Sequence, residues 1–258
     1  MKSKKNQIRH EQILTLVRDR GTQSVAEIAG HCLVSEETIR RDAAALALRG
    51  LVTKMHGFVG LVQELPEAPF DRRMRANREA KLAVCKQAAS LVADGDSVML
   101  DTGTTTFYLA EALRDKRDLT VVTNSPDIAR LLSGISGNRV HLAGGEISLG
   151  NVTCFGPATV EFVTRFKVKH GFISAAAVSA RDGIMDTNLL EADFARAVLR
   201  CSEQGNVLVD ASKFGKTAFA RVCGFDAVTR LISDERPPDA LLQALLASGS
   251  AVEVVGRD

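Results

Sequence analysis

The sequence lacks any apolar run long enough to cross a bilayer, so we expect no transmembrane segment and no membrane partner. Residues 1–10 are basic and polar, and they lack the apolar core of a secretory signal peptide. We find no internal repeat and no low-complexity tract. These absences exclude membrane and fibrous classes and favour a cytoplasmic globular protein.

The sequence also lacks paired cysteines. Its five cysteines form no CxxC pair, and their number is odd. They are Cys32, Cys85, Cys154, Cys201 and Cys223. This pattern argues against a disulfide scaffold and against a structural zinc site. We therefore expect buried reduced thiols, with no metal and no cofactor.

Charge is present but unevenly distributed. Residues 1–57 carry ten Lys/Arg and six Asp/Glu, whereas residues 58–258 carry 23 and 25. The first segment is thus net positive by four and the second net negative by two, which gives the overall charge of +2. A basic N-terminal segment is typical of nucleic-acid-binding domains, although many basic N-termini are merely solvated.

Three segments can be distinguished along the chain. The pattern of residues 1–57 predicts short helices followed by a hairpin. Residues 58–79 contain two prolines and predict a linker that runs into a helix, and residues 80–258 predict alternating strands and helices. The expected strands are 97–100, 119–122, 139–142, 170–174, 206–209, 230–232 and 251–255, and the expected helices are 81–92, 105–113, 127–132, 190–202 and 239–247. Strands separated by helices predict a Rossmann-like, mostly parallel α/β domain.

The N-terminal segment has the start and stop signals of a helix-turn-helix. A helix over 9–20 stops at Gly21, and Ser24 and Glu27 form a capping box for the next helix. Ser35 caps a third helix that turns Ile39 inward and the arginines outward, followed by a β-wing over 51–57. The expected DNA-binding residues are Ser35, Thr38, Arg40, Arg41, Lys54 and His56. The alternative is a generic three-helix bundle with a solvated basic face.

The α/β segment has polar residues after its expected strands. Asp101 and the run from Gly103 to Thr106 stand between a strand and a helix, where free N–H groups and hydroxyls suit an anion, or simply cap the helix. By the rule that ligands lie at the carboxyl ends of parallel strands, the expected effector-binding residues are Asp101, Gly103, Thr104, Thr105, Thr106, Thr123, Asn124, Gly144, Gly145, Glu191, Asp210 and Lys213. The alternative for Asn124, Gly144 and Gly145 is that they form turns. For Glu191 it is a surface helix, and for Asp210 and Lys213 it is a salt bridge within a loop.

The motifs together resemble those of DeoR-type bacterial regulators. The resemblance is carried by residues 35–42, by Gly50-Leu51 and Met55-His56-Gly57, and then by residues 101–105, 123–124, 144–145 and 210–215. This chain has Phe58 where the family usually has a second glycine, and Ala195 where many members have lysine. The resemblance implies a winged helix-turn-helix on a sensor domain related to sugar-phosphate isomerases. It also implies a repressor of sugar catabolism that a phosphorylated sugar releases from DNA.

Three functions remain open at this point. The first is a regulator that binds double-stranded operator DNA as a homo-oligomer, a dimer or tetramer, and responds to a phosphorylated sugar or polyol. The second is a sugar-phosphate isomerase, for which Asp101 and Glu191 are candidate bases. A DNA-binding protein whose second domain only oligomerises is the third. We favour the first and assign no catalytic residue, since no clear catalytic pair is present.

Overall fold

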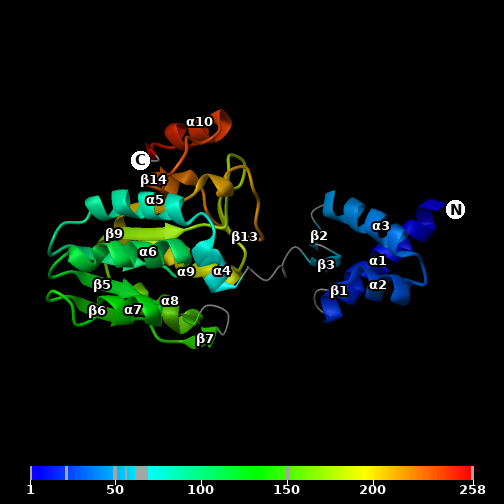
Figure 1. Ribbon diagram of the computed structural model, residues 1–258, viewed down its shortest axis with the longest axis horizontal. Helices are drawn as coiled ribbons and strands as arrows, with labels where there is room; N and C mark the ends of the chain where they lie inside the picture. Colours follow the sequence, from blue (N-terminus) through cyan, green and yellow to red (C-terminus); the bar gives the residue numbers. More distant parts are fainter. Residues whose placement is uncertain are drawn as a thin grey trace. The chain divides into compact units, whose positions relative to one another are not determined.

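The computed structural model describes residues 2–20, 23–48, 51–55, 57–61, 69–148 and 152–256. The chain forms two compact units, Met1–Glu67 and Ala68–Asp258. We call them the head and the α/β domain, and each is drawn in Figure 1. Among the described residues, no helix combines the length and the apolarity that crossing a bilayer requires.

The head is a three-helix unit with a small antiparallel sheet. Its elements are α1 (Lys2–Arg20), β1 (Gln23–Ser24), α2 (Val25–Cys32), α3 (Glu36–Leu48), β2 (Val52–Met55) and β3 (Phe58–Leu61). The capping box at the start of α2 is confirmed, because Glu27 N–H donates to Ser24 Oγ and Ser24 N–H donates to Glu27 Oε2. The core closes on apolar side chains at helical spacing, among them Ile13, Ile28 and Ile39.

The wing is longer than the sequence indicated. Residues 58–61, which we expected to open the linker, form β3, and this strand pairs with both β2 and β1. Val59 is fully buried in the head's core, and this burial is what holds the segment to the head. At the other end of the expected linker, α4 (Phe70–Arg75) and the start of α5 (Arg78–Ser90) belong to the α/β domain.

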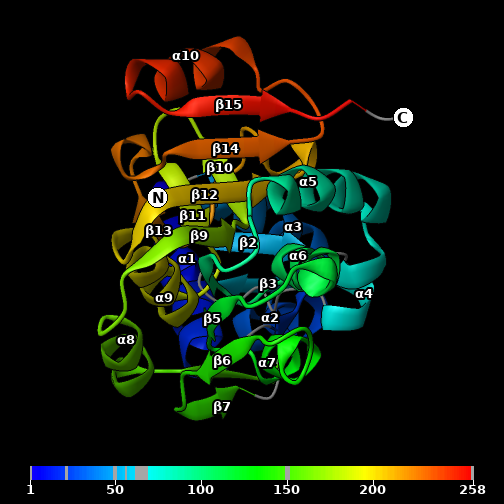
Figure 2. The same cartoon turned by 90° about the vertical axis from the view of Figure 1, so that its left-hand side faces the viewer.

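The α/β domain is built on a seven-stranded sheet with order β15-β14-β12-β9-β4-β5-β6. Every neighbouring pair is parallel, and Figure 2 shows the strands stacked in this order from β15 to β6. The strands are β4 (Ser97–Leu100), β5 (Thr120–Thr123), β6 (Arg139–Leu142), β9 (Val168–Ser174), β12 (Ser202–Val209), β14 (Arg230–Ser233) and β15 (Ala251–Val254). All seven predicted strands are therefore confirmed, as is the mostly parallel α/β class.

Two hydrophobic cores lie on opposite faces of this sheet. In β4, Val98 and Leu100 enter one core and Met99 enters the other, as the alternation of strand side chains requires. Helices α5, α6 (Thr104–Ala112) and α7 (Pro126–Leu132) cover one face, and α8 (Pro157–Val163) and α9 (Leu189–Arg200) cover the other (Figure 2). Helix α10 (Asp239–Ala247) packs beside the edge strand β15.

Several short elements were not anticipated. They are the hairpin β7 (Glu146–Ser148) and β8 (Thr153–Phe155), the small sheet of β10 (Ala177–Ser179), β11 (Gly183–Asp186) and β13 (Ala220–Cys223), and helix α8. The predicted helix 190–202 also ends earlier, at Arg200, because Ser202 already pairs with Val168 as the first residue of β12. The four-residue strands of the main sheet were recognisable because they are apolar runs between helical patterns, whereas the strands of the hairpin and of the small sheet do not alternate with helices in this way.

Candidate functional sites

The exposed surface of α3 is the candidate DNA-binding surface of the head. Ser35 precedes the helix, and its Oγ accepts from Thr38 N–H at 3.3 Å and lies 2.9 Å from Thr38 Oγ1. Ile39, Ala43 and Leu46 are fully buried, as predicted. Because the apolar stripe faces inward, Glu36, Glu37, Arg40 and Arg41 face solvent.

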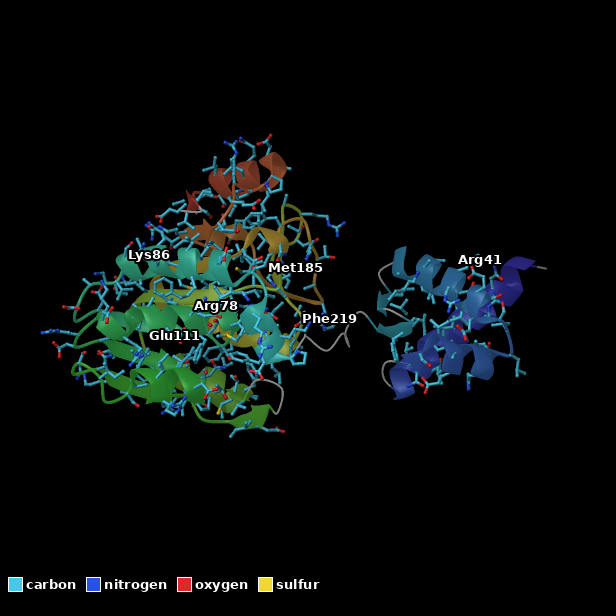
Figure 3. The ribbon with its side chains drawn as sticks, viewed as in Figure 1. Arg41, Arg78, Lys86, Glu111, Met185 and Phe219 are labelled. Atoms are coloured by element: carbon cyan, nitrogen blue, oxygen red, sulfur yellow. The ribbon has the colours of Figure 1, made fainter. Side chains whose placement is uncertain are left out.

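The two arginines of α3 differ in their partners. Arg40 donates to Glu36 Oε2 at 2.6 Å and also lies 3.9 Å from Glu37 Oε2. Arg41 is exposed and forms no ion pair with any described residue; Figure 3 labels it on α3. Lys54 is exposed on β2, whereas His56 lies outside the described residues. Arg41 is therefore the cation of this helix that is most available to a DNA partner.

An ion pair that sequence analysis missed fixes α3 against α1. Asp42, directly after the arginines, is buried and accepts from Arg9 Nε. His10 Nε2 lies 3.3 Å from its second oxygen. Hydrogen bonding to Asp42 raises the pKa of Arg9 further above its ordinary value. The spacing of 33 residues between Arg9 and Asp42 carries no local signal, so this contact required the structure.

In the α/β domain, Asp101 marks the point where the strand order reverses. The chain runs from β4 outward through β5 and β6, then returns to β9 on the other side of β4. Asp101 is buried between these strands: its N–H donates to Phe172 O, and its Oδ2 accepts from Ser174 N–H at 2.9 Å. Such a reversal opens a crevice at the carboxyl ends of the strands, which is where ligands of open parallel sheets bind.

The loop after Asp101 leads directly into α6. Gly103 packs closely against β9, because a Cβ there would lie 2.4 Å from Ser174 Oγ and the serine hydroxyl would have to turn away. The hydroxyl of Thr106 donates back to Gly103 O at 3.2 Å and is fully buried. Thr104 and Thr105 are also buried. The N–H groups of this first turn have no earlier carbonyl to bond, so this end of α6 is an electropositive helix terminus at the crevice.

The residues after β5 and β6 hold the β7–β8 hairpin and α8. Asn124 is fully buried and donates to Cys154 O at 2.9 Å, and Thr123 Oγ1 accepts from Ser125 N–H. A Cβ at Gly145 would lie 2.2 Å from Thr159 Oγ1 and 2.7 Å from Phe155 O, so this glycine serves close packing. At Gly144 a Cβ would meet nothing within 4 Å.

The remaining effector candidates lie on the far side of β9. Asp210 is buried after β12, and its Oδ1 accepts from Ser212 N–H at 3.0 Å and from Asn77 Nδ2 at 2.8 Å. Lys213 is half-buried in the same loop. Glu191, in the first turn of α9, hydrogen bonds with the buried Asp186; burial raises the pKa of Asp186, and the bond to Glu191 opposes that rise.

The sheet order separates these candidates into two groups. Asp210 follows β12 and Gly144 follows β6, four strands away, which corresponds to roughly 19 Å at the usual strand spacing. One small molecule does not span this distance. Asp101, the start of α6, Ser174 and Asp210 lie at the carboxyl ends of three adjacent strands, β4, β9 and β12. Sequence analysis missed Ser174 and Asn77, which contribute to this compact group.

A winged helix-turn-helix joined to a parallel α/β domain with a polar site at its carboxyl edge has the organisation of a ligand-responsive DNA-binding regulator. Residues 9–64 match the DeoR-like helix-turn-helix domain, and residues 76–235 match the DeoR C terminal sensor domain. The chain belongs to the DeoR family of transcriptional regulators.

Two curated regulators agree with this assignment. The chain is 30% identical over 237 residues to the glycerol-3-phosphate regulon repressor of Escherichia coli, covering 92% of this chain and 94% of the relative. It is 31% identical over 236 residues to the L-fucose operon activator of Haemophilus influenzae, covering 90% and 94%. Among solved structures, ribose 5-phosphate isomerase A from Methanocaldococcus jannaschii is 20% identical with a TM-score of 0.38, covering 54% of this chain and 55% of that one.

Proposed function

We propose that this protein is a repressor of a carbohydrate or polyol catabolic operon and that a phosphorylated intermediate releases it from its operator. The observation that carries the proposal is the compact polar group at the strand-order reversal, in a chain whose other unit is a winged helix-turn-helix. The name of the glycerol-3-phosphate regulon repressor, a full-length relative, supports a phosphorylated effector.

The effector's phosphate binds at the start of α6 and its hydroxyls bind the carboxylates. The free N–H groups of Gly103 to Thr106 and the helix dipole favour an anion there. Asp101 and Asp210 accept hydroxyl hydrogen bonds, and Lys213, in the Asp210 loop, adds positive charge at the same edge of the sheet. Within this proposal, the outer wall of the site is supported by Thr123, Asn124, Gly144 and Gly145. Glu191 affects the site indirectly, through its hydrogen bond with the buried Asp186.

Operator DNA is bound by a homo-oligomer, a dimer or tetramer, with one head on each half-site. Arg41 and Thr38 contact base edges in the major groove, whereas Arg40, Ser35, Lys54 and His56 contact the phosphate backbone. A protein that binds operator DNA acts where that DNA lies, and we propose a cytoplasmic location on this ground. One relative is named as an activator, the L-fucose operon activator. Whether this protein represses or activates its operon is therefore tested with a reporter gene driven by the operator.

The isomerase alternative is not favoured. An isomerase needs a base free to take a proton from the substrate carbon. Glu191 already hydrogen bonds with Asp186, and the two relatives that the chain matches over 94% of their length are named as regulators. We propose that the site binds its ligand without transforming it, which a sugar-phosphate isomerisation assay checks directly.

The effector is tested by thermal unfolding of the full chain against sugar phosphates, polyol phosphates and the matching unphosphorylated compounds. A ligand that binds only the native state raises Tm, by an amount set by its concentration relative to Kd. We expect one phosphorylated compound to raise Tm and its unphosphorylated counterpart to have no effect. Equal shifts for both members of the pair contradict a phosphate-specific site.

A further inference from the structure

Helix α4 is the first described element that follows the head in sequence, and it is fixed to α6. Met74 O, in α4, accepts from the Tyr108 hydroxyl at 2.9 Å. The rings of Phe70 and Phe107 also meet edge to face, with centroids 6.2 Å apart. Helix α6 is the helix whose first turn forms the candidate anion site, so α4 contacts one wall of the effector crevice through this helix.

The last turn of α4 is held by a buried lysine of α5. Lys81 Nζ donates to Arg73 O at 2.5 Å and to Ala76 O at 2.8 Å, and the side chain is almost fully buried. Burial lowers the pKa of Lys81, and the nearby Asp210 carboxylate opposes this effect. The charge on Lys81 is therefore stabilised in part by an expected effector-binding residue.

Asn77 joins the α4–α5 corner to the Asp210 loop. Its backbone is left-handed, with φ 50° and ψ 37°, a conformation that non-glycine residues seldom adopt. Its amide donates to Asp210 Oδ1 at 2.8 Å and to Ser212 Oγ at 3.2 Å. The bond borders a cleft of about 490 Å³ between the corner and the loops after β12 and β14, whose lining includes Arg75, Arg78 and Asp234. Figure 3 labels Arg78 on this side of the domain.

We propose that Asn77 is the positioning residue that transmits the state of the effector site to α4, and through α4 to the segment leading to the head. The inference rests on the proposed function. Asp210 Oδ1 already accepts from Asn77 and from Ser212 N–H, so a ligand hydroxyl that reaches Asp210 competes with the Asn77 amide. Loss of the bond to Asp210 leaves the left-handed corner with only the longer bond to Ser212 Oγ and loosens α4.

The ligand-free test compares Asn77→Gly, Asp210→Ala and the double variant by hydrogen exchange of the full chain. Glycine keeps the left-handed backbone and removes only the amide. Ser136→Gly is the matched control, because Ser136 is exposed with φ 50° and lies in the loop before β6. The reporters are the amides of Arg73 and Ala76, which donate within α4.

We expect Asn77→Gly and Asp210→Ala each to speed exchange of α4 by about tenfold, the change that loss of a hydrogen bond produces. The double variant should be no faster than Asn77→Gly alone, because Asn77→Gly already removes the bond to Asp210 together with the bond to Ser212 Oγ. The Ser136→Gly control should exchange like wild type. Wild-type exchange of α4 in Asp210→Ala, or additive effects in the double variant, would overturn the inference.

A second arm adds glycerol 3-phosphate, ribose 5-phosphate or inorganic phosphate at millimolar concentration. A probe that raises Tm should speed α4 exchange in wild type and in Ser136→Gly but not in Asn77→Gly. A probe that raises Tm without changing wild-type α4 refutes the inference while sustaining the proposed function. If no probe raises Tm, the proposed function is weakened, and the ligand-free comparison still decides whether Asn77 couples the loop to α4.

Discussion

The candidate residues of the head and those of the α/β domain differ in how far they are already engaged. Arg41 and Lys54 are exposed, and Arg41 has no described partner. Asp101 and Asn124 are buried, and each bonds to the protein's own backbone. DNA is contacted by side chains on the protein surface, whereas a small ligand is enclosed by residues that also stabilise the fold. Substitutions in the two regions should therefore fail in different ways.

The largest effect is expected where the head itself depends on a buried charge. Asp42→Ala leaves the half-buried Arg9 and His10 without their carboxylate partner, and loss of a hydrogen bond to a charged group costs about 1.5–3 kcal/mol. Thermal unfolding should show the head's transition at lower temperature and the α/β domain's transition unchanged. If both transitions move to lower temperature by the same amount, or neither moves, the result contradicts a separately stabilised head.

Arg41→Ala should remove a DNA contact without disturbing the fold. A bidentate arginine–base contact contributes about 1–3 kcal/mol, so operator affinity should fall by about fivefold to 150-fold. Fluorescence anisotropy with labelled operator measures the loss. Arg130→Ala, at an exposed position of α7, removes the same charge from the α/β domain and should leave affinity unchanged. Equal losses for the two variants would indicate a net-charge effect.

Neighbouring glycines separate a packing role from a ligand role. Gly145→Ala places a Cβ against Phe155 O and Thr159, and overpacking of this kind costs about 1–3 kcal/mol, so the α/β domain should unfold at lower temperature. Gly144→Ala has open space and should keep the wild-type Tm. Differential scanning calorimetry distinguishes the two. A Gly145→Ala variant as stable as Gly144→Ala would contradict the close packing described for this loop.

The smallest effect concerns the buried carboxyl beside Glu191. Burial raises the pKa of Asp186, so the folded state holds this proton to higher pH than the unfolded chain does. Stability from Asp186 is thus present below the ordinary aspartate pKa of about 3.9 and is lost as pH rises through the raised value. Asp186→Asn should match wild type at low pH and be more stable at neutral pH, as urea titrations at several pH values can measure.

An exposed carboxyl provides the control for this pH dependence. Asp115→Asn, on the surface after α6, should leave the difference between low and neutral pH unchanged. An Asp186→Asn variant whose stability advantage is the same at every pH would show that desolvation of the charge is not the cause.

The sheet was predictable because each central strand is a short apolar run between helical patterns, and such runs are typical of buried parallel strands. The capping box likewise fixed the start of α2. The wing was not fully predictable, since Gly57 marks a turn but does not show that Val59 is buried beyond it. The three-residue strands β7 and β8 depend on long-range contacts such as Asn124 with Cys154.

For the candidate site, the sequence allowed us to predict only which polar residues follow strands. Asp101 and Asp210 follow strands, and parallel order places such residues at one edge. The separation of Gly144 from Asp210 depended on the strand order, which local patterns do not determine. Asn77 lies 133 residues from Asp210, so nothing in its local sequence indicates their hydrogen bond. Contacts of this kind set which polar residues face a ligand and which support the fold.

The central claim is that ligand binding in the α/β domain controls DNA binding by the head. Its most direct test is the operator affinity of the full chain, on DNA selected with the protein itself, titrated with phosphorylated sugars and polyols and with their unphosphorylated counterparts. We predict that one phosphorylated compound weakens operator binding by about tenfold or more, and that its unphosphorylated counterpart leaves it unchanged. Operator affinity that stays constant with every compound that raises Tm would contradict the account.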